Sequence, residues 1–228
     1  MKTFTEYTNL DEGVNDPAIF KAVFMAGGPG SGKSFIANQT GMKSMGLRLI
    51  NSDDIFEHEL KKAGMKMDAK TIFSTKGQML RGHAKKLTGK KKGMSLDGRL
   101  GLLIDGTGKD VDKIKKQQAS LTELGYDTMM IFVNTTEITS LRRNKMRARS
   151  LDDDKVSAMW TDVQKNIGAF QKMFGNNFVV VDNSEGIDYK KETLSAYKFT
   201  TKWVKRPIKN HIAKKWIAAQ KEARGITA

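Results

Sequence analysis

Short apolar segments alternate with longer amphipathic segments along most of the chain. The apolar segments are rich in β-favouring residues and predict five strands, at Ile19–Ala26, Leu47–Asn51, Gly101–Asp105, Thr128–Asn134 and Phe178–Asp182. The amphipathic segments predict helices at Lys33–Thr40, Asp54–Ala63, Asp110–Leu124, Ile138–Arg149 and Asp154–Phe174. Such alternation is typical of an α/β fold, in which helices cover both faces of a parallel sheet.

Two stretches depart from this alternation. Residues 66–99 predict one helix at Thr71–Lys86, followed by a Gly- and Lys-rich loop at Thr88–Gly98. The stretch from Tyr189 to the end holds eleven Lys and Arg residues against two Glu, and Pro207 predicts that it forms two helices. The apolar stripe of the second helix favours packing on the domain over a role as a nucleic-acid-binding arm. We therefore divide the chain into a lead-in (1–17), a main domain (18–186) and a basic helical extension (187–228).

Composition narrows the possible chemistry. The 228 residues include no Cys, which excludes disulfides and Cys nucleophiles, and three His without metal-binding spacing. No apolar segment approaches the roughly 20 residues of a membrane span, so we predict a soluble, cytoplasmic protein without a membrane partner. The formal net charge of +15 favours polyanionic partners such as nucleic acid, although a solvated basic surface would have the same composition.

The strongest motif is Gly27-Gly28-Pro29-Gly30-Ser31-Gly32-Lys33-Ser34, which fits the phosphate-loop pattern G-x-x-x-x-G-K-[ST]. It lies between the first predicted strand and the first predicted helix, where such a loop must lie. Glycines there let backbone N–H groups converge on phosphate oxygens, aided by the positive end of the helix. We expect Lys33 to reach the phosphates of a nucleoside triphosphate and Ser34 to ligate Mg²⁺. The expected nucleotide-binding residues are Gly28, Pro29, Gly30, Ser31, Gly32, Lys33 and Ser34.

Acidic residues follow two of the predicted strands. Asp53 and Asp54 come after the second strand, and Asp105 ends the third, two residues before Thr107. Because parallel strands end at one edge of the sheet, both acidic sites should lie near the triphosphate. A phosphotransferase needs one carboxylate to deprotonate the attacking hydroxyl and usually another to organise the metal or the acceptor. Helix capping by the Asp pair and a simple turn at Asp105 are the structural alternatives.

An Arg-rich segment, 141–149, precedes three consecutive Asp residues. Arg143 and Arg147 are four residues apart and would share one face of a helix. Over the phosphates, such a pair would offset the charge of the transferring phosphoryl group. The following polar loop and helix are typical of a lid that excludes water, while a solvated basic helix end is the alternative.

Together these motifs resemble the kinase domain of phage polynucleotide 5′-hydroxyl kinases, and they are similar to those of zeta-toxin-like kinases, which phosphorylate a nucleotide sugar. The resemblance covers about residues 20–183 and rests on the phosphate loop, Ile50-Asn51-x-Asp53-Asp54, the Asp that ends the third strand, and Arg143-Asn144-x-x-Arg147. It implies a P-loop NTPase fold with a five-stranded parallel sheet, and ATP with Mg²⁺ as cofactors. It also implies that Asp53 is the general base and that Arg143 and Arg147 clamp the phosphates. We expect Asp105 to act beside them, and Asp54 and Thr107 to bind the acceptor.

The resulting hypothesis is a kinase that transfers the γ-phosphate of ATP to a hydroxyl, with a nucleic-acid 5′-hydroxyl as the leading acceptor. A nucleotide or nucleotide sugar is the close alternative, and a nucleic-acid-binding ATPase or a DNA-binding protein with a degenerate site are the others. One departure weakens the polynucleotide assignment. Polynucleotide kinases carry an acceptor-binding Arg three residues after the base, whereas this chain has Phe56 there. Residues 85–92 or the C-terminal segment would then have to supply the positive charge that binds the acceptor.

The N-terminus adds a separate resemblance. Residues 1–7 resemble the leader that directs proteins into the prohead of myovirus-type bacteriophages, and Leu10-Asp11-Glu12-Gly13 fits the cleavage pattern of that family's prohead protease. The resemblance implies packaging in the virion, whereas an ordinary helical N-terminus is the alternative.

Overall fold

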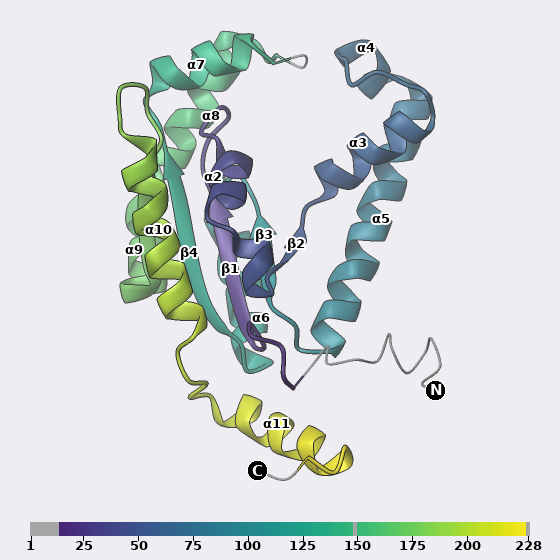
Figure 1. The fold of residues 1–228 in the computed structure, drawn as a ribbon. Helices are drawn as coiled ribbons and strands as arrows, with labels where there is room; N and C mark the ends of the chain where they lie inside the picture. Colours follow the sequence, from purple (N-terminus) through teal and green to yellow (C-terminus); the bar gives the residue numbers. More distant parts are fainter. Residues whose placement is uncertain (1–13, 148–149, 227–228) are drawn as a thin grey trace.

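Five parallel strands form the centre of the computed structural model, which describes residues 14–147 and 150–226 (Figure 1). The strands are β1 (Lys21–Ala26), β2 (Arg48–Ile50), β3 (Leu102–Asp105), β4 (Asp127–Asn134) and β5 (Phe178–Asp182). They pair in the order β2-β3-β1-β4-β5, and every pair is parallel. The five predicted strands and the parallel α/β class are therefore confirmed. This order brings the carboxyl ends of β1, β2 and β3 to one region of the sheet edge.

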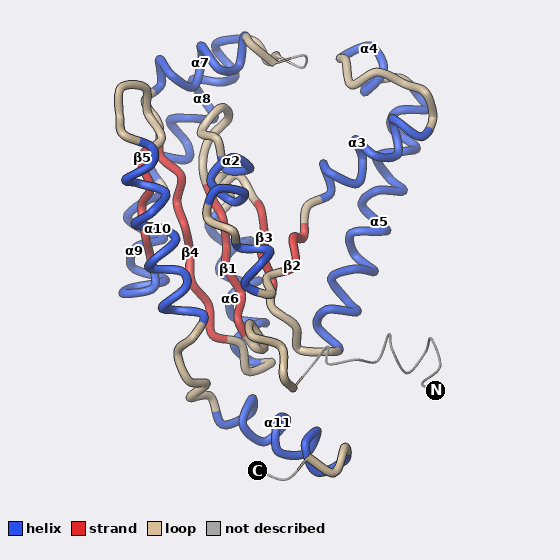
Figure 2. The backbone as a smooth tube through the Cα atoms, viewed as in Figure 1, coloured by secondary structure: helices blue, strands red, loops and turns tan. Residues whose placement is uncertain are grey.

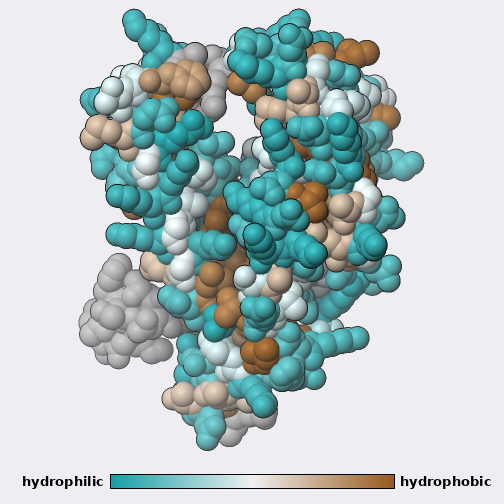
Figure 3. Space-filling model, turned by 180° about the vertical axis from the view of Figure 1, so that it is seen from behind, coloured by the Kyte–Doolittle hydropathy of each residue, from teal (hydrophilic) through white to brown (hydrophobic). Residues whose placement is uncertain are grey.

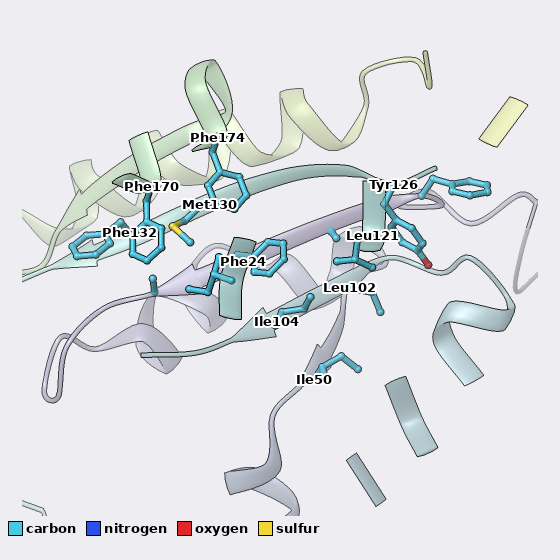
Figure 4. Close-up of a cluster of buried hydrophobic side chains, with 14 of the residues drawn as sticks. Phe24, Ile50, Leu102, Ile104, Leu121, Tyr126, Met130, Phe132, Phe170 and Phe174 are labelled. Carbon is cyan, nitrogen blue, oxygen red and sulfur yellow. The ribbon is translucent and has the colours of Figure 1, made fainter. Parts of the chain in front are cut away.

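Helices cover both faces of this sheet (Figure 2). On one face, α2 (Lys33–Gln39) and α10 (Tyr189–Val204) pack on a cluster that includes Val23 and Met25 of β1. On the other face, α6 (Val111–Glu123), α8 (Asp153–Lys165) and α9 (Ile167–Phe174) pack on Phe24 and its neighbours. Figure 4 shows the aromatic centre of this second cluster, where Phe170 and Phe174 of α9 meet Phe24 and Phe132. Alternate residues of β1 thus face opposite layers, as a strand buried on both sides requires.

A helical arm follows β2 and has a small core of its own. It consists of α3 (Ser52–Lys62), α4 (Ala69–Phe73) and α5 (Thr75–Asp97), and Figure 1 shows it standing beside the β2 edge of the sheet. The buried hydrophobic residues of this core are Phe56, Leu60, Ile72 and Ala84. The predicted loop at Thr88–Gly98 is wrong, because α5 continues to Asp97. Propensity alone disfavours a helix with so many glycines, but packing against α3 supplies the stability that propensity lacks.

Two other helix predictions need correction. The helix predicted at 138–149 is α7 (Glu137–Lys145), which ends earlier than expected. The single helix predicted at 154–174 is interrupted at Asn166, whose side-chain amide donates to the backbone carbonyls of Gly108 and Lys109, each at 2.9 Å. These two long-range bonds tie the junction of α8 and α9 to the loop after β3.

The C-terminal stretch forms two helices, α10 and α11 (His211–Ala223), so the predicted break around Pro207 is confirmed. Trp203 of α10 is buried against the amino end of β1, where the Lys21 ammonium lies 5.2 Å from the centre of its ring and 2.6 Å from Asp127 Oδ2. The Trp216 ring of α11 packs nearly perpendicular to the Phe20 ring, with 5.5 Å between ring centres. Both helices therefore pack on the sheet domain. The proposed leader falls within residues 1–13, outside the described residues, and no described helix has the length and apolarity to cross a membrane.

The exposed glycines of α5 allow a test of its helical structure. A Cβ added at Gly89 would meet no atom within 4 Å, whereas one added at Gly77 would overlap the Thr71 carbonyl. Because glycine inside a helix costs about 0.5–1 kcal/mol relative to alanine, Gly89→Ala is expected to raise the free energy of unfolding by about that amount. Gly77→Ala should lower it. Urea denaturation measures both, and a destabilised Gly89→Ala protein would contradict a continuous α5.

Candidate functional site

The loop between β1 and α2 has the backbone shape of a phosphate cradle. Gly30 and Gly32 adopt positive φ angles of 72° and 84°. A Cβ at Gly30 would lie 2.8 Å from the Ser140 carbonyl oxygen, and one at Gly32 would collide with the Asn183 side chain. Glycine is therefore required at both positions, for conformation and for space.

Side chains from distant elements hold the carbonyl groups of this loop. The Ser140 hydroxyl of α7 donates to the Pro29 carbonyl, and Arg143 Nη1 donates to the Gly30 carbonyl at 3.3 Å. Asn183 Nδ2, just after β5, donates to the Ser31 carbonyl at 2.7 Å. Three consecutive carbonyl groups thus accept hydrogen bonds from outside the loop. This favours an orientation of the loop peptides in which N–H groups remain available to an anion. Sequence reasoning missed Ser140 and Asn183 because nothing local marks residues that contact the loop from more than 100 positions away.

A cavity of about 800 Å³ opens beside the loop. Its wall combines the loop, the start of α2, the start of α3, the end of β3 and part of α5. Figure 3 shows the molecule hollowed between its two upper lobes. The predicted residues that line the cavity are Gly28, Pro29, Gly32, Lys33, Ser34, Asp53, Asp54, Asp105, Thr107 and Arg147. The structure therefore brings the loop, both acidic sites and one of the two predicted arginines to one place.

Lys33 lies among the charged groups of this cavity. Its Nζ donates to the Gly27 carbonyl at 2.9 Å. Burial lowers the pKa of Lys33, and the nearby Arg147 lowers it further. The carboxylates of Asp105 and Asp53 act in the opposite direction and raise this pKa. The ammonium thus interacts electrostatically with both acidic sites and with the predicted arginine, as convergence on one ligand requires.

Asp105 is held by a residue that sequence reasoning assigned no role. Asn51 Nδ2 donates to Asp105 Oδ2 at 2.9 Å, while Asn51 Oδ1 accepts from the Asp53 backbone N–H at 2.8 Å and caps α3. One side-chain amide therefore connects the two acidic sites. Asp105 Oδ1 is buried and accepts no hydrogen bond from any residue that the structure describes. Apart from its place in the Ile50-Asn51-x-Asp53-Asp54 motif, the sequence signal for Asn51 is its preference for the N-cap position, which by itself indicates structure.

Asp105 carries a testable consequence for pH dependence. Burial raises its pKa; Lys33 opposes this rise, while Asp53 and Asp54 add to it. Asn51→Asp keeps a good helix cap but replaces the donor by a second carboxylate, which should raise the pKa of Asp105 further. A carboxyl with a raised pKa ionises only at higher pH. The acid limb of the pH profile of kcat/KM, measured for the phosphoryl transfer that the sequence predicts, should therefore move to higher pH. Asn210→Asp, at the cap of α11, is the matched control, and an unmoved acid limb in the Asn51→Asp enzyme would contradict this role.

The two predicted arginines do not share a helix face. Arg143 lies in α7 and contacts the loop, whereas Arg147 follows the end of α7 and lines the cavity. The expectation of one helical face is wrong because α7 ends at Lys145. The buried Asn144 side chain makes two hydrogen bonds to the backbone of Leu151, at 2.7 and 3.0 Å, and so closes the connection toward α8. Residues 148–149 of the predicted lid lie outside the described residues.

Phe56 belongs to the arm core and not to the cavity wall. It is 1% exposed, and the Arg81 guanidinium lies 5.4 Å from the centre of its ring. Its side chain therefore stabilises the arm and is not available to bind an acceptor.

Comparison with known proteins places this geometry in context. The family model described as zeta toxin matches residues 12–193, and no curated protein matches the chain significantly. A protein of Chloroflexus aurantiacus assigned as a kinase shares 14% identity, with a TM-score of 0.52 over 78% of this chain and 97% of its own. A protein of the PezAT toxin–antitoxin system of Streptococcus pneumoniae shares 17% identity, with a TM-score of 0.50 over 98% of this chain and 96% of its own.

A third similar structure comes from the Pnkp1/Rnl/Hen1 RNA repair complex, with 17% identity and a TM-score of 0.50 over 66% of this chain and 46% of that chain. At these identities the structural matches show the fold alone. The family match covers most of the chain, including the loop, both acidic sites and the arginine segment. The chain therefore belongs to the zeta toxin family of P-loop kinases.

Proposed function

We propose that this protein is an ATP-dependent kinase that transfers the γ-phosphate to a hydroxyl group. The observation that carries the proposal is that Lys33, Asp53, Asp105 and Arg147 line the same cavity as the phosphate loop. A nucleotide binder needs only the loop. A carboxylate exposed in the same cavity is the additional group that transfer to a hydroxyl requires.

The residues present fit a nucleoside triphosphate and Mg²⁺. The loop supplies a cradle that only glycine permits, and the buried Asp105 Oδ1 has an unused acceptor position near Lys33. Within the described ranges, no group of three or more His, Asp or Glu side chains is placed to hold a metal ion. That suits Mg²⁺, which proteins commonly hold through one or two side chains together with substrate phosphates. Ser34 and Asp105 are the residues that would hold it.

In the proposed reaction, the hydroxyl oxygen of the acceptor attacks the γ-phosphorus while the Asp53 carboxylate accepts the hydroxyl proton. The bond between the γ-phosphorus and the β–γ bridging oxygen breaks, and ADP leaves. Lys33 and Arg147 offset the negative charge on the transferring phosphoryl group, and Arg143 supports the loop through the Gly30 carbonyl. Asp54 and Thr107 bind the acceptor from the same cavity. Bound Mg²⁺ would polarise the phosphate oxygens.

We propose a nucleic-acid 5′-hydroxyl as the acceptor, and a nucleotide or nucleotide sugar as the second candidate. The net charge of +15 and the similarity to a chain of an RNA repair complex support the first. Membership of the zeta toxin family supports the second.

The test is transfer of label from γ-labelled ATP to 5′-hydroxyl oligonucleotides, nucleosides and UDP-sugars. We expect a labelled acceptor in at least one group, and the labelled group identifies the substrate class. ATP hydrolysis stimulated by DNA without any labelled acceptor would instead favour a nucleic-acid-dependent ATPase.

We also propose, from the sequence alone, that residues 1–12 are a leader removed during phage assembly. The intact mass of the protein from purified virions tests this, since a protein that starts at Met1 or is missing from the particles would refute it.

A further inference from the structure

The outer side of α10, α11 and the turn between them is strongly basic. Residues 193–221 include eight Lys and Arg residues and no Asp or Glu. Seven of the eight are exposed: Lys198, Lys202, Lys205, Arg206, Lys209, Lys214 and Lys215. We call these seven residues the basic surface. It presents cations to solvent with no carboxylate between them in the sequence.

On α10 three of these lysines form a row. Lys198, Lys202 and Lys205 are four and three residues apart, so they share one face of the helix. The buried residues of α10 lie on the opposite face, and they are Thr193, Ala196, Thr200, Trp203 and Val204. At a rise of about 1.5 Å per residue, successive lysines of the row are about 5–6 Å apart along the helix axis. Such a row can follow an extended polyanion.

α5 is also rich in lysine, but its exposed lysines are arranged differently. Lys85 and Lys86 are adjacent, as are Lys90 and Lys91. Adjacent positions of a helix point about 100° apart, so these side chains spread around α5. The row on α10 therefore differs from the lysines of α5 in its alignment.

The protein itself does not neutralise the basic surface. Within the part of the chain that the structure describes, no carboxylate forms an ion pair with any of the seven residues. Arg206 donates one hydrogen bond, to the neutral Asn177 side chain at 3.0 Å. Like charges four residues apart on a helix are mildly destabilising. Stability of the fold therefore does not account for this arrangement.

The basic surface lies at the end of the sheet opposite to the cavity. Trp203 packs at Lys21, the first residue of β1, whereas the phosphate loop follows the last residue of that strand. Figure 1 shows α11 beyond the amino ends of the strands, with α3 and α7 at the other end. Six residues of β1 span about 20 Å. A small ligand in the cavity therefore does not neutralise the basic surface.

The chemistry of this surface fits the backbone of a nucleic acid. Six of the seven residues are Lys, which binds phosphate as a point charge without the fork geometry of Arg. Phosphate contacts of this kind hold a protein on nucleic acid without reading its bases. A helix that binds a membrane surface inserts an apolar face. The apolar residues Ile208, Trp216 and Ile217 instead pack on the sheet domain.

We propose that the basic surface binds nucleic acid through its phosphate groups, without sequence preference and separately from the cavity. The inference goes beyond the proposed kinase function and does not depend on it. It assigns the chain a second site, which holds the protein on nucleic acid while the cavity stays accessible to its own ligands.

The experiment removes the row on α10 from the full chain, with Lys198→Gln, Lys202→Gln and Lys205→Gln combined in one protein. Fluorescence anisotropy measures binding to two DNA duplexes of unrelated sequence at salt concentrations between about 50 and 200 mM. We expect the triple variant to bind both duplexes about 10- to 100-fold more weakly than the wild type at the lower salt concentrations. The slope of log K against log salt should become shallower by about 2–3, since each lost phosphate contact contributes about 1.

A matched control removes the same charge from exposed lysines of α6 and α9, with Lys115→Gln, Lys116→Gln and Lys172→Gln. It should bind DNA nearly as well as the wild type, because its net charge equals that of the first variant but the row on α10 is intact. Lys198→Arg, Lys202→Arg and Lys205→Arg together should retain binding, which separates lost charge from lost packing. A non-hydrolysable ATP analogue should not compete with DNA.

Three outcomes would overturn this site. Equal losses in the two Gln variants would show attraction by net charge alone, and competition by the ATP analogue would place the DNA in the cavity. Tighter binding to vesicles of phosphatidylserine and phosphatidylcholine than to DNA would make the partner a membrane. DNA binding that requires the row, in a protein that labels no acceptor, would contradict the proposed function and leave the basic surface supported.

Discussion

Replacement of Asp53 by Asn is expected to lower phosphoryl transfer by about 10²–10⁴-fold and to leave ATP binding nearly unchanged. The substitution keeps the size of the side chain and the cap of α3, because the cap uses the backbone N–H of residue 53 and the Asn51 side chain. It removes only the carboxylate that would accept the hydroxyl proton. The measurement is single-turnover transfer from γ-labelled ATP to the acceptor identified above, alongside nucleotide binding.

Asp54→Asn is the matched control for this prediction. Asp54 lies next to Asp53, is exposed like it and lines the same cavity. We expect it to affect the KM for the acceptor more than kcat, because its proposed role is acceptor binding. If Asp54→Asn abolished transfer while Asp53→Asn did not, the two roles would be exchanged. If neither variant affected transfer while both hydrolysed ATP normally, no base would be assigned to this edge of the sheet.

Replacement of Lys33 by Met is expected to lower kcat/KM by about 10²–10³-fold and to weaken nucleotide binding, in contrast to Asp53→Asn. Methionine keeps most of the apolar stem but removes the charge that faces the triphosphate. The loss also removes the positive charge that opposes the raised pKa of Asp105, so this carboxyl should titrate at still higher pH. Titration with a fluorescent ATP analogue and the acid limb of any residual activity measure the two effects.

Bound triphosphate should in turn raise the pKa of Lys33, because its negative charge stabilises the ammonium that burial disfavours. For the nucleotide-binding and activity measurements on Lys33→Met, Lys91→Met is a suitable control, since it removes an exposed lysine outside the cavity wall. Unchanged nucleotide affinity in Lys33→Met would show that the loop binds its ligand through backbone groups alone.

The main features of the fold could be predicted because they depend on local sequence. Strand period, buried apolar runs and the glycine pattern of the phosphate loop are properties of a few adjacent residues, and all five strands were confirmed. Helix limits were less predictable. Whether residues 88–97 form a loop or a helix depends on contacts between α3 and α5, and the break at Asn166 depends on carbonyls almost 60 residues away.

The candidate site divides in the same way. By itself, the sequence determined the phosphate loop and the acidic residues that follow β2 and β3, since each is defined by neighbouring residues and by its position at a strand end. Only the tertiary structure decided that Asn51 connects the two acidic sites, that Arg143 and Arg147 take different positions, and that Lys92 alone of the lysines at 85–92 lines the cavity. The physical reason is that hydrogen-bond partners and burial are set by elements distant in sequence, which a local pattern does not encode.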